Sequence, residues 1–368
     1  MPRANSRRRA PWLCLLLVLC LSCWLSPHES AARTAPVESG KQLYARYCQL
    51  CHAADATGYA ADNAPSLVSR EFLSSADDAF LARGIRLGRP NTAMAAYGKE
   101  RGGPLDEQQI AELVRFLRKQ GPPAKKLPAL KVTGDAARGG ELYQRECQSC
   151  HGSRRKAGNA PQLYNSEFLA AASPAFLQHA IRKGRPPTKM PAFAAKLSAE
   201  QISDLVAWLQ SLRTTPPGLS RGKEVVPADL PLVTNPKGAA PELTLRENRF
   251  VAAEQVKQAL AAKRRMIIID ARSPSDWIQY HIPGSVPIPY YDTAQLERVP
   301  NDDTWVVAYC ACPHHASGEV VDALRKRGFK NTAVLDEGIL FWRQQGFPLE
   351  GEAVTQGSAP PSAGPPPR

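Results

Sequence analysis

Apolar residues recur at helical spacing in two segments of the chain, at residues 110–117 and 202–209. Steps of three and four residues place them on one face of a helix. Asp106 and Ser198 stand at the expected N-cap positions, and each is followed three residues later by a glutamine, as in a capping box. The pattern predicts two amphipathic helices that bury one face against other helices.

These two helices close two copies of one module, because five groups of residues recur in the same order. The groups are Gly40–His52 with Gly139–His151, Asn63–Leu67 with Asn159–Leu163, Glu71–Leu73 with Glu167–Leu169, Phe80–Met94 with Phe176–Met190, and Ile110–Leu117 with Ile202–Leu209. Two copies are too few for a solenoid. We therefore expect two sequential all-α domains, at residues 36–121 and 132–214.

The pattern changes after residue 242. Met266–Asp270 and Thr304–Cys310 are short apolar runs of the kind found in buried strands, and the segment Val320–Leu324 resembles a helix. Strands that alternate with helices predict an α/β domain with a mainly parallel sheet, at residues 243–352. Residues 215–242 are rich in Pro and Gly and are interpreted as a linker. Residues 353–368 are expected to form a disordered tail.

The N-terminus, residues 1–32, has the pattern of a secretory signal. Four arginines precede an apolar run, Trp12–Leu25, which is short for a membrane span of about 20 residues. Small residues before and at Ala32 allow cleavage there. An uncleaved anchor, or a lipid on Cys23 in a weak lipobox, are the alternatives. The pattern predicts a periplasmic or exported protein, membrane-associated if the segment is retained.

Composition adds a basic surface to this picture. The chain has 368 residues, 43% hydrophobic and 22% charged, with a formal net charge of +13. A basic surface favours an acidic redox partner or an anionic membrane face. No segment has the pattern of a base-reading module, so nucleic acid is not expected as a partner.

The spacing of the nine cysteines indicates which chemistry the protein performs. Three lie in the N-terminal segment, and the others form the pairs Cys48/Cys51, Cys147/Cys150 and Cys310/Cys312. In the first two pairs, two thiols three positions apart are followed by His52 or His151. This pattern is typical of thioether attachment of haem, with the histidine as axial iron ligand. A zinc site and a redox dithiol are the alternatives, but duplication behind an export signal favours two covalently bound haem c groups.

The sixth iron ligand is expected from methionine. Apart from Met1 and Met266, the chain has only Met94 and Met190, at matched positions of the repeat. Methionine is a frequent distal ligand in electron-transfer haems, and a gap-filling core residue is the alternative. Arg89 and Arg185, also matched, are candidates to bind a haem propionate or to remain ordinary solvated side chains.

The repeated elements resemble class I cytochrome c. They are the Cys-x-x-Cys-His opening, the loop that ends in methionine, and the closing helix. The resemblance covers residues 38–120 and 133–212 and implies a small helical bundle around each haem, with one porphyrin edge exposed to a redox protein partner. It implies that His52 and Met94 ligate one iron and that His151 and Met190 ligate the other. Met94 precedes Ala95, whereas Met190 precedes the family's usual proline.

The C-terminal domain resembles a rhodanese. The resemblance rests on Asp270–Arg272, Trp277, His281–Ser285, Val306–Cys310, Asp336–Gly338, Trp342 and Gly346–Pro348. It implies that Cys310 accepts a sulfane sulfur as a persulfide from a small sulfur compound. A thiol at the end of a strand, before a helix, meets backbone N–H groups and the positive end of the helix dipole, which lower its pKa. Ser317 is the expected cap of that helix.

The cysteine loop departs from the common rhodanese pattern, because Cys310–Ser317 contains no arginine. This puts thiosulfate turnover in doubt, and Ala316 excludes a phosphatase. His314 or His315 is expected to supply part of the lost positive charge. Cys312 has three interpretations: it resolves the persulfide by forming a disulfide, binds a metal together with Cys310 and a histidine, or is inert.

The combination predicts an exported dihaem protein that transfers electrons and couples this transfer to sulfur chemistry at Cys310 and Cys312. The alternative is a pure electron carrier in which the rhodanese-like domain is an inactive docking or sensing module. In either case, two haem domains joined by a short connection are expected to act as a relay.

Overall fold

The computed structural model describes residues 38–61, 63–154, 158–214, 226–227, 229–311 and 314–355. The described residues all belong to one compact unit, which begins at Glu38. The expected signal segment, Cys312 and residues 356–368 lie outside them. Within the described ranges, none of the helices combines the length and the apolarity needed to cross a bilayer.

The first repeat folds as a bundle of short helices. Its elements are α1 (Gly40–Tyr47), α2 (Gln49–His52), α3 (Arg70–Ser75), α4 (Asp78–Leu87), the 3-10 helix η1 (Lys99–Arg101) and α5 (Glu107–Arg118). The expected capping box of α5 is present, with Asp106 and Gln109 bonding each other's backbone N–H groups. Helix α1 crosses α5 closely, because a Cβ at Gly40 would lie 2.2 Å from the carbonyl oxygen of Glu112.

The second repeat folds in the same way. Its elements are α6 (Ala136–Glu146), α7 (Gln148–His151), α8 (Ser166–Ala171), α9 (Pro174–Lys183) and α10 (Ala199–Ser211). Ser198 and Gln201 form the expected capping box. At the crossing of α6 and α10, a Cβ at Gly139 would lie 2.0 Å from the carbonyl oxygen of Asp204. The side chain of Asp204 is itself buried and accepts hydrogen bonds from Arg138.

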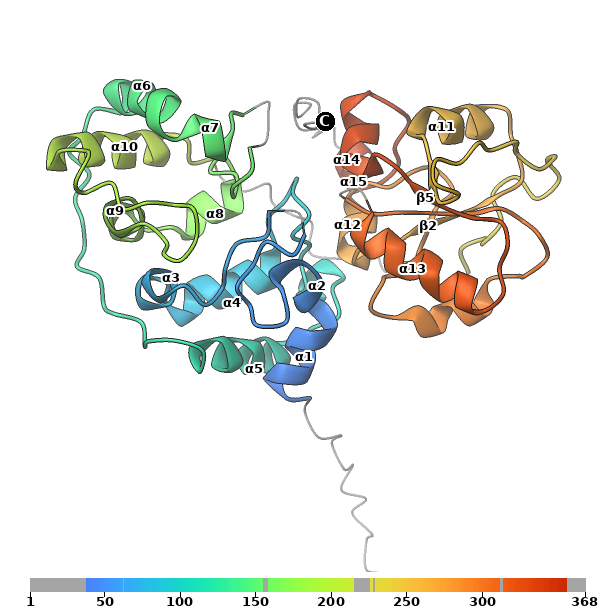
Figure 1. The fold of residues 1–368 in the computed structure, drawn as a ribbon, viewed down its shortest axis with the longest axis horizontal. Coiled ribbons are helices and arrows are strands. Elements are labelled where there is room, and N and C mark those ends of the chain that lie inside the picture. The colour runs from blue at the N-terminus through green and yellow to red at the C-terminus, as the bar shows by residue number, and fades with distance from the viewer. Residues whose placement is uncertain are drawn as a thin grey trace, which may run out of the picture. The chain divides into compact units, whose positions relative to one another are not determined.

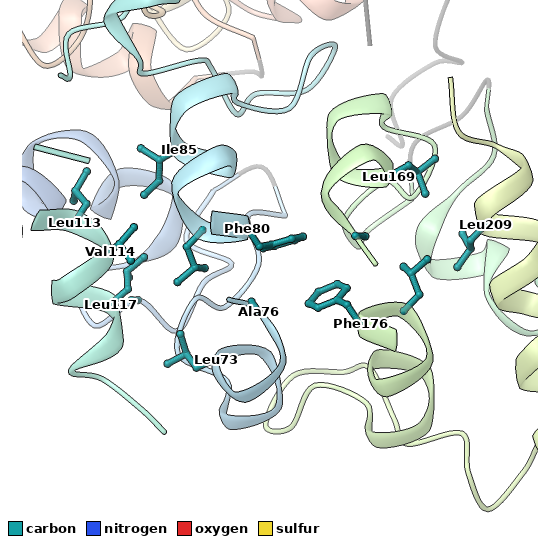
Figure 2. Packing of buried hydrophobic residues seen from close by; sticks show 14 of the residues in the cluster. Leu73, Ala76, Phe80, Ile85, Leu113, Val114, Leu117, Leu169, Phe176 and Leu209 are labelled. Atoms are coloured by element: carbon teal, nitrogen blue, oxygen red, sulfur yellow. The ribbon is translucent and has the colours of Figure 1, made fainter. Parts of the chain in front are cut away.

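The two helical modules share one apolar core. Phe80 on α4 and Phe176 on α9 occupy matched positions, and their rings stack with centroids 4.7 Å apart. Figure 2 shows these two rings facing each other, with Leu73 and Val114 on one side and Leu209 on the other. Stacked aromatic pairs stabilise by about 0.5–1.5 kcal/mol beyond the burial of their area. The modules therefore pack as one helical body around a central aromatic contact.

The C-terminal region forms the expected α/β domain. Its sheet has the order β1-β5-β4-β2-β3, with every paired strand parallel. The strands are β1 (Phe250–Val251), β2 (Ile267–Asp270), β3 (Val286–Pro287), β4 (Val306–Tyr309) and β5 (Thr332–Leu335). The helices are α11 (Ala253–Ala261), α12 (Pro274–Gln279), η2 (Thr293–Arg298), α13 (His315–Lys326), α14 (Gly338–Gln344) and α15 (Glu352–Thr355).

Both faces of this sheet are covered. Successive residues of β2 enter opposite cores: Ile267 and Ile269 pack with α13, whereas Ile268 packs with α11 and α14. Figure 1 shows α11 and α13 on opposite sides of the sheet. A parallel sheet covered on both faces requires continuous apolar strands, which explains the unbroken apolar run at 266–269.

The domain begins earlier than the sequence pattern indicates. Leu230 and Leu232, assigned from composition to the linker, pack against the core on the α13 side. Thr234 forms an antiparallel bridge with Met266, the residue before β2. The Pro and Gly residues of this segment indicated a linker, and its few apolar residues have neither a helical nor a strand period that would have indicated part of the domain.

Candidate functional site

Each Cys-x-x-Cys-His motif lies on a short helix that continues from a longer one. Cys48 ends α1 and begins α2, and Cys147 does the same between α6 and α7. The hydroxyl of Tyr44 donates to the carbonyl oxygen of Ala53 at 2.7 Å, and the hydroxyl of Tyr143 donates to that of Gly152 at 2.7 Å. In both modules a buried tyrosine thus fixes the backbone directly after the histidine.

The two histidines are held in the same orientation. Nδ1 of His52 lies 2.9 Å from the carbonyl oxygen of Pro65, and Nδ1 of His151 lies 2.7 Å from that of Pro161. A carbonyl only accepts, so Nδ1 carries the proton and Nε2 presents its lone pair. Metal-bound histidines are usually oriented by such a bond. Burial lowers the pKa of both imidazoles, which favours the neutral form that ligates iron.

The thiols beside these histidines are not those of a reactive dithiol. Burial raises the pKa of Cys48 to about 12 and that of Cys147 to about 11. Redox-active Cys-x-x-Cys pairs instead have a lowered thiol pKa. In the described part of the chain, no three His, Cys, Asp or Glu side chains converge as a metal-ligand group. The geometry fits haem attachment better than a dithiol or zinc site.

The methionine loops are built alike in the two modules. The N–H of Arg89 donates to the carbonyl oxygen of Met94 at 2.7 Å, and the N–H of Arg185 donates to that of Met190 at 3.0 Å. Both methionines are half-buried. The replacement of proline by Ala95 after Met94 leaves this hydrogen bond in place. Both methionines remain candidate distal ligands, held by the same local bonds.

The two loop arginines lie in the apolar contact between the modules. Arg185 lies over the rings of Phe72 and Phe176, and Arg89 lies over that of Phe80. Burial lowers the pKa of both guanidinium groups to about 10. Among the described residues, no carboxylate lies within ion-pair distance of either one. Two half-buried cations that form no ion pair with a described carboxylate fit the carboxylate groups of haem.

The contact between the modules is close to two-fold symmetric, because matched residues of the repeat exchange matched contacts. The contacts are Arg83 with Glu167 at 2.6 Å, His179 with Glu71 at 2.8 Å, the Ser69 hydroxyl with the Pro186 carbonyl at 2.9 Å, and the Asn165 amide with the Pro90 carbonyl at 2.8 Å. Such an isologous arrangement is that of a symmetric dimer. It places the two arginine and methionine loops equivalently about one interface.

Cys310 lies at the carboxyl end of β4, between the two flanking helices α13 and α14. Its side chain is 2% exposed, and its Sγ lies 3.2 Å from the hydroxyl oxygen of Ser317. The N–H of Ile339 donates to the carbonyl oxygen of Cys310. The expectation that Ser317 caps α13 is wrong: the helix begins at His315 and its N-cap is His314, so Ser317 lies in the first turn and faces the thiol.

His314 is held by groups outside the cysteine loop. It has a left-handed backbone with φ of 87°, and its Nε2 lies 2.8 Å from a carboxylate oxygen of Asp336. The pKa of that carboxyl is lowered, first by Arg246 and also by His314. The ring of His314 lies against Phe250. His315 is exposed at the start of α13.

Asp270, Arg272 and His281 support the loops rather than face the cysteine. Arg272 forms a buried ion pair with Asp270 at 2.7 Å, and Tyr309 donates to the same carboxylate at 2.8 Å. Nδ1 of His281 lies 2.7 Å from the carbonyl oxygen of Trp277. A buried charge pair of this kind requires all its partners, so we expect it to hold the strand ends in place.

Sequence reasoning missed a contact between the α/β domain and the first helical module. The hydroxyl of Tyr290 donates to the carbonyl oxygen of Tyr47 at 2.8 Å, directly before the first cysteine motif. The hydroxyl of Ser275 donates to the carbonyl oxygen of Ala96 at 2.6 Å, two residues after Met94. One signal for this contact exists in the sequence: the matched positions of Tyr47 and Tyr97 are Glu146 and Phe193.

The comparisons with known families agree with this division of the chain. Residues 35–117 and 134–209 match the family model described as cytochrome c oxidase, cbb3-type, subunit III. Residues 252–345 match the rhodanese-like domain.

Individual relatives resemble parts of the chain. The dihydro-heme d1 dehydrogenase of Pseudomonas aeruginosa is 31% identical over 62% of this chain and 44% of its own length. The cbb3-type cytochrome c oxidase subunit FixP of Bradyrhizobium sp. is 28% identical over 47% of this chain and 60% of its own length. This chain thus spans about half the length of these relatives. The solved rhodanese-like domain of the Anabaena protein Alr3790 is 24% identical, with a TM-score of 0.28, over 33% of this chain and 90% of that one.

Proposed function

Since the chain carries tandem cytochrome c domains followed by a rhodanese-like domain, we propose that it is an exported dihaem protein that passes electrons released by sulfur chemistry at Cys310 to a redox partner. Cytochrome c domains bind haem c covalently. We further propose how many haems the chain binds, which residues ligate them, which sulfur step supplies the electrons and where the protein is located.

The observation that carries the proposal is the matched histidine geometry. In both modules a histidine follows two cysteines and is oriented through Nδ1 by a proline carbonyl. We propose that Cys48 and Cys51 attach one haem and Cys147 and Cys150 the other. His52 and Met94 then ligate the first iron, and His151 and Met190 ligate the second. When bound, each group supplies a one-electron Fe(III)/Fe(II) couple, which methionine ligation shifts to higher potential.

The symmetric contact between the modules supports a relay. Arg83, Glu167 and the stacked pair Phe80–Phe176 hold the modules against each other at fixed geometry. Half-buried Arg89 and Arg185 would neutralise haem carboxylates at this contact. Rigid packing of this kind would hold two redox groups at one distance, which sets the rate of electron exchange between them.

The proposed sulfur step releases two electrons, which is the number that two haems can accept. The Cys310 thiol and hydrogen sulfide join in one S–S bond to give a cysteine persulfide, with release of two protons and two electrons. The two haem groups, when bound, would supply two one-electron acceptors for this pair, and an external acceptor protein would take the electrons from them. The helix dipole of α13 and the hydroxyl of Ser317, 3.2 Å from Sγ, are placed to stabilise the sulfur anion. Cys312, outside the described residues, is the candidate to take over the outer sulfur: its thiol would attack that sulfur to form a persulfide on Cys312, with the Cys310 thiol as leaving group.

The exported location and the acidic partner rest on charge and on the N-terminal pattern. The formal net charge of +13 favours an acidic redox protein. Exposed Lys183 and Lys189 flank the Met190 loop, where such a partner would approach the second haem. Electrostatic attraction of this kind raises the association rate and weakens with salt.

Rapid mixing of the oxidised, haem-loaded full chain with sulfide, thiosulfate or a persulfide donor tests the coupling. We expect at least one donor to reduce the haems, and Cys310→Ala to abolish that reduction. Ser211→Ala, an exposed hydroxyl at the end of α10, is the matched control. Haem spectra that stay oxidised with every donor, or equal reduction in Cys310→Ala, would refute the coupling.

The burial of Cys310 favours a second candidate, a pure electron carrier with an inactive rhodanese-like docking module. The thiol is 2% exposed, and its loop lacks the arginines that bind sulfur anions in the family. A sulfurtransferase assay of the full chain with cyanide as acceptor separates the two candidates. Turnover that disappears in Cys310→Ala supports the first, and no turnover with any donor supports the second.

A further inference from the structure

The rhodanese-like domain meets the first cytochrome domain at the edge of the sheet that carries Cys310. In a parallel sheet all strands end at the same edge. Cys310 follows β4, Ser275 lies on α12 after β2, and Tyr290 lies shortly after β3. The groups that contact the first cytochrome domain and the candidate sulfur site therefore share one edge of the domain.

The contact covers both haem-binding segments of the first cytochrome domain. Tyr290 donates to the carbonyl oxygen of Tyr47, beside Cys48, and its hydroxyl lies 3.5 Å from that of Tyr97. Burial raises the pKa of both phenols, so they remain protonated donors. The ring of Tyr291 meets that of Tyr47 edge-on, with centroids 4.8 Å apart.

The methionine loop is held in the same contact. The buried hydroxyl of Ser275 donates to the carbonyl oxygen of Ala96 at 2.6 Å. At the margin, the Arg343 guanidinium donates to the side-chain oxygen of Asn91 at 2.9 Å. Thus the segment before Cys48 and the loop of Met94 both touch the rhodanese-like domain.

The second cytochrome domain lacks the side chains that the first domain contributes to this contact. The positions that match Tyr47, Asn91 and Tyr97 are Glu146, Pro187 and Phe193. Neither proline nor phenylalanine reproduces the side-chain hydrogen bonds, and a glutamate would place a charge where a tyrosine ring now packs. Cys150 of the second motif is exposed, whereas Cys51 is half-buried. The contact thus breaks the two-fold symmetry of the repeat.

We propose that the tyrosine and serine contact makes the first haem the entry point for electrons from Cys310 and leaves the second haem as the exit to the external partner. This order rests on the proposed sulfur function. Oxidation of the Cys310 thiol with sulfide to a persulfide releases two electrons, which enter one at a time through the first haem. The first of them passes on to the second haem, so that both are reduced.

Hydrogen exchange of the haem-loaded full chain tests the contact independently of sulfur chemistry. Ser275→Ala with Tyr290→Phe removes the hydrogen bonds to Ala96 and Tyr47, worth about fivefold each in stability. We therefore expect about fivefold faster exchange in residues 91–97, which contain Ala96, and likewise in residues 44–48, which contain Tyr47. The matched loop, residues 187–193, is the internal control and should not change. Unchanged exchange in residues 91–97, or equal acceleration of both loops, would overturn the contact.

Rapid mixing with the effective sulfur donor tests the order. Replacement of Cys147 and Cys150 by alanine leaves only the first haem, which takes one electron of each pair while a second copy of the same variant takes the other, and we expect its reduction to remain detectable. Replacement of Cys48 and Cys51 leaves only the second haem, and we expect reduction at least tenfold slower. Equal rates in both variants would overturn the order. If no donor reduces the wild type, the sulfur function and with it the order fail, while hydrogen exchange still decides the contact.

Discussion

The stacked pair Phe80–Phe176 lies at the centre of the contact between the cytochrome domains, and replacing its rings tests whether the domains act as one body. Both side chains are buried, and their ring planes are inclined by 29° at 4.7 Å. Phe80→Leu and Phe176→Leu each exchange a ring for a smaller apolar side chain, at an expected cost of about 1–3 kcal/mol. The double variant should cost less than the sum, by the coupling energy of about 0.5–1.5 kcal/mol for an aromatic pair.

Urea unfolding of the four haem-loaded proteins, followed by circular dichroism and haem absorbance, measures this coupling. We expect both cytochrome domains of the wild type to unfold in a single transition, because they share one core. Leu113→Ala with Leu209→Ala, on the closing helices of the two domains, is the control and should be additive within about 0.5 kcal/mol. A coupling no larger than in this control, or two separate transitions in the wild type, would refute the account of one rigid relay.

Three further predictions concern ligation, pH and packing. Met94→Ala and Met190→Ala should each remove half of the optical band of methionine-ligated ferric haem and lower one of the two potentials in a redox titration; an unchanged band would exclude that methionine as ligand. Arg138 holds the pKa of the Asp204 carboxyl below its usual value, so the ion pair stabilises the fold fully above about pH 4 and loses this effect as the pH falls further. Asp204→Asn should therefore weaken the dependence of the melting temperature on acid pH. A pH profile identical to that of the wild type would contradict the role of the pair. Gly139→Ala should lower the melting temperature far more than Gln144→Ala, an exposed site on the same helix, because its Cβ would meet the Asp204 carbonyl; equal melting temperatures would disprove that crossing.

The sequence predicted those features that depend on local pattern. The capping boxes at Asp106 and Ser198, the buried strands at 267–270 and 306–309 and the α/β architecture follow from periodicity and turn chemistry, and the structure confirms them. The sequence predicted the cap of α13 at Ser317, whereas the cap is His314. The left-handed backbone at His314, where the helix begins, is not indicated by any residue pattern.

Contacts between domains could not be predicted from the sequence, for a different reason. The Tyr290–Tyr47 hydrogen bond joins residues far apart in the chain, and its formation depends on how whole domains pack. Periodicity reports which face of an element is buried, but not against which domain. The difference between Tyr97 and its matched Phe193 was visible in the repeat, yet without the fold it carried no geometric meaning.

Covalent attachment of haem at both cysteine motifs underlies the proposed electron transfer, and the mass of the intact protein measures this attachment. The full chain, produced with a functional haem-attachment system and purified under denaturing conditions that remove loosely bound groups, should have the mass of its polypeptide plus two haems. Each of the pairs Cys48/Cys51 and Cys147/Cys150, when replaced by alanine, should remove one haem. The mass of the bare polypeptide, or of a single haem adduct in the wild type, would contradict the account.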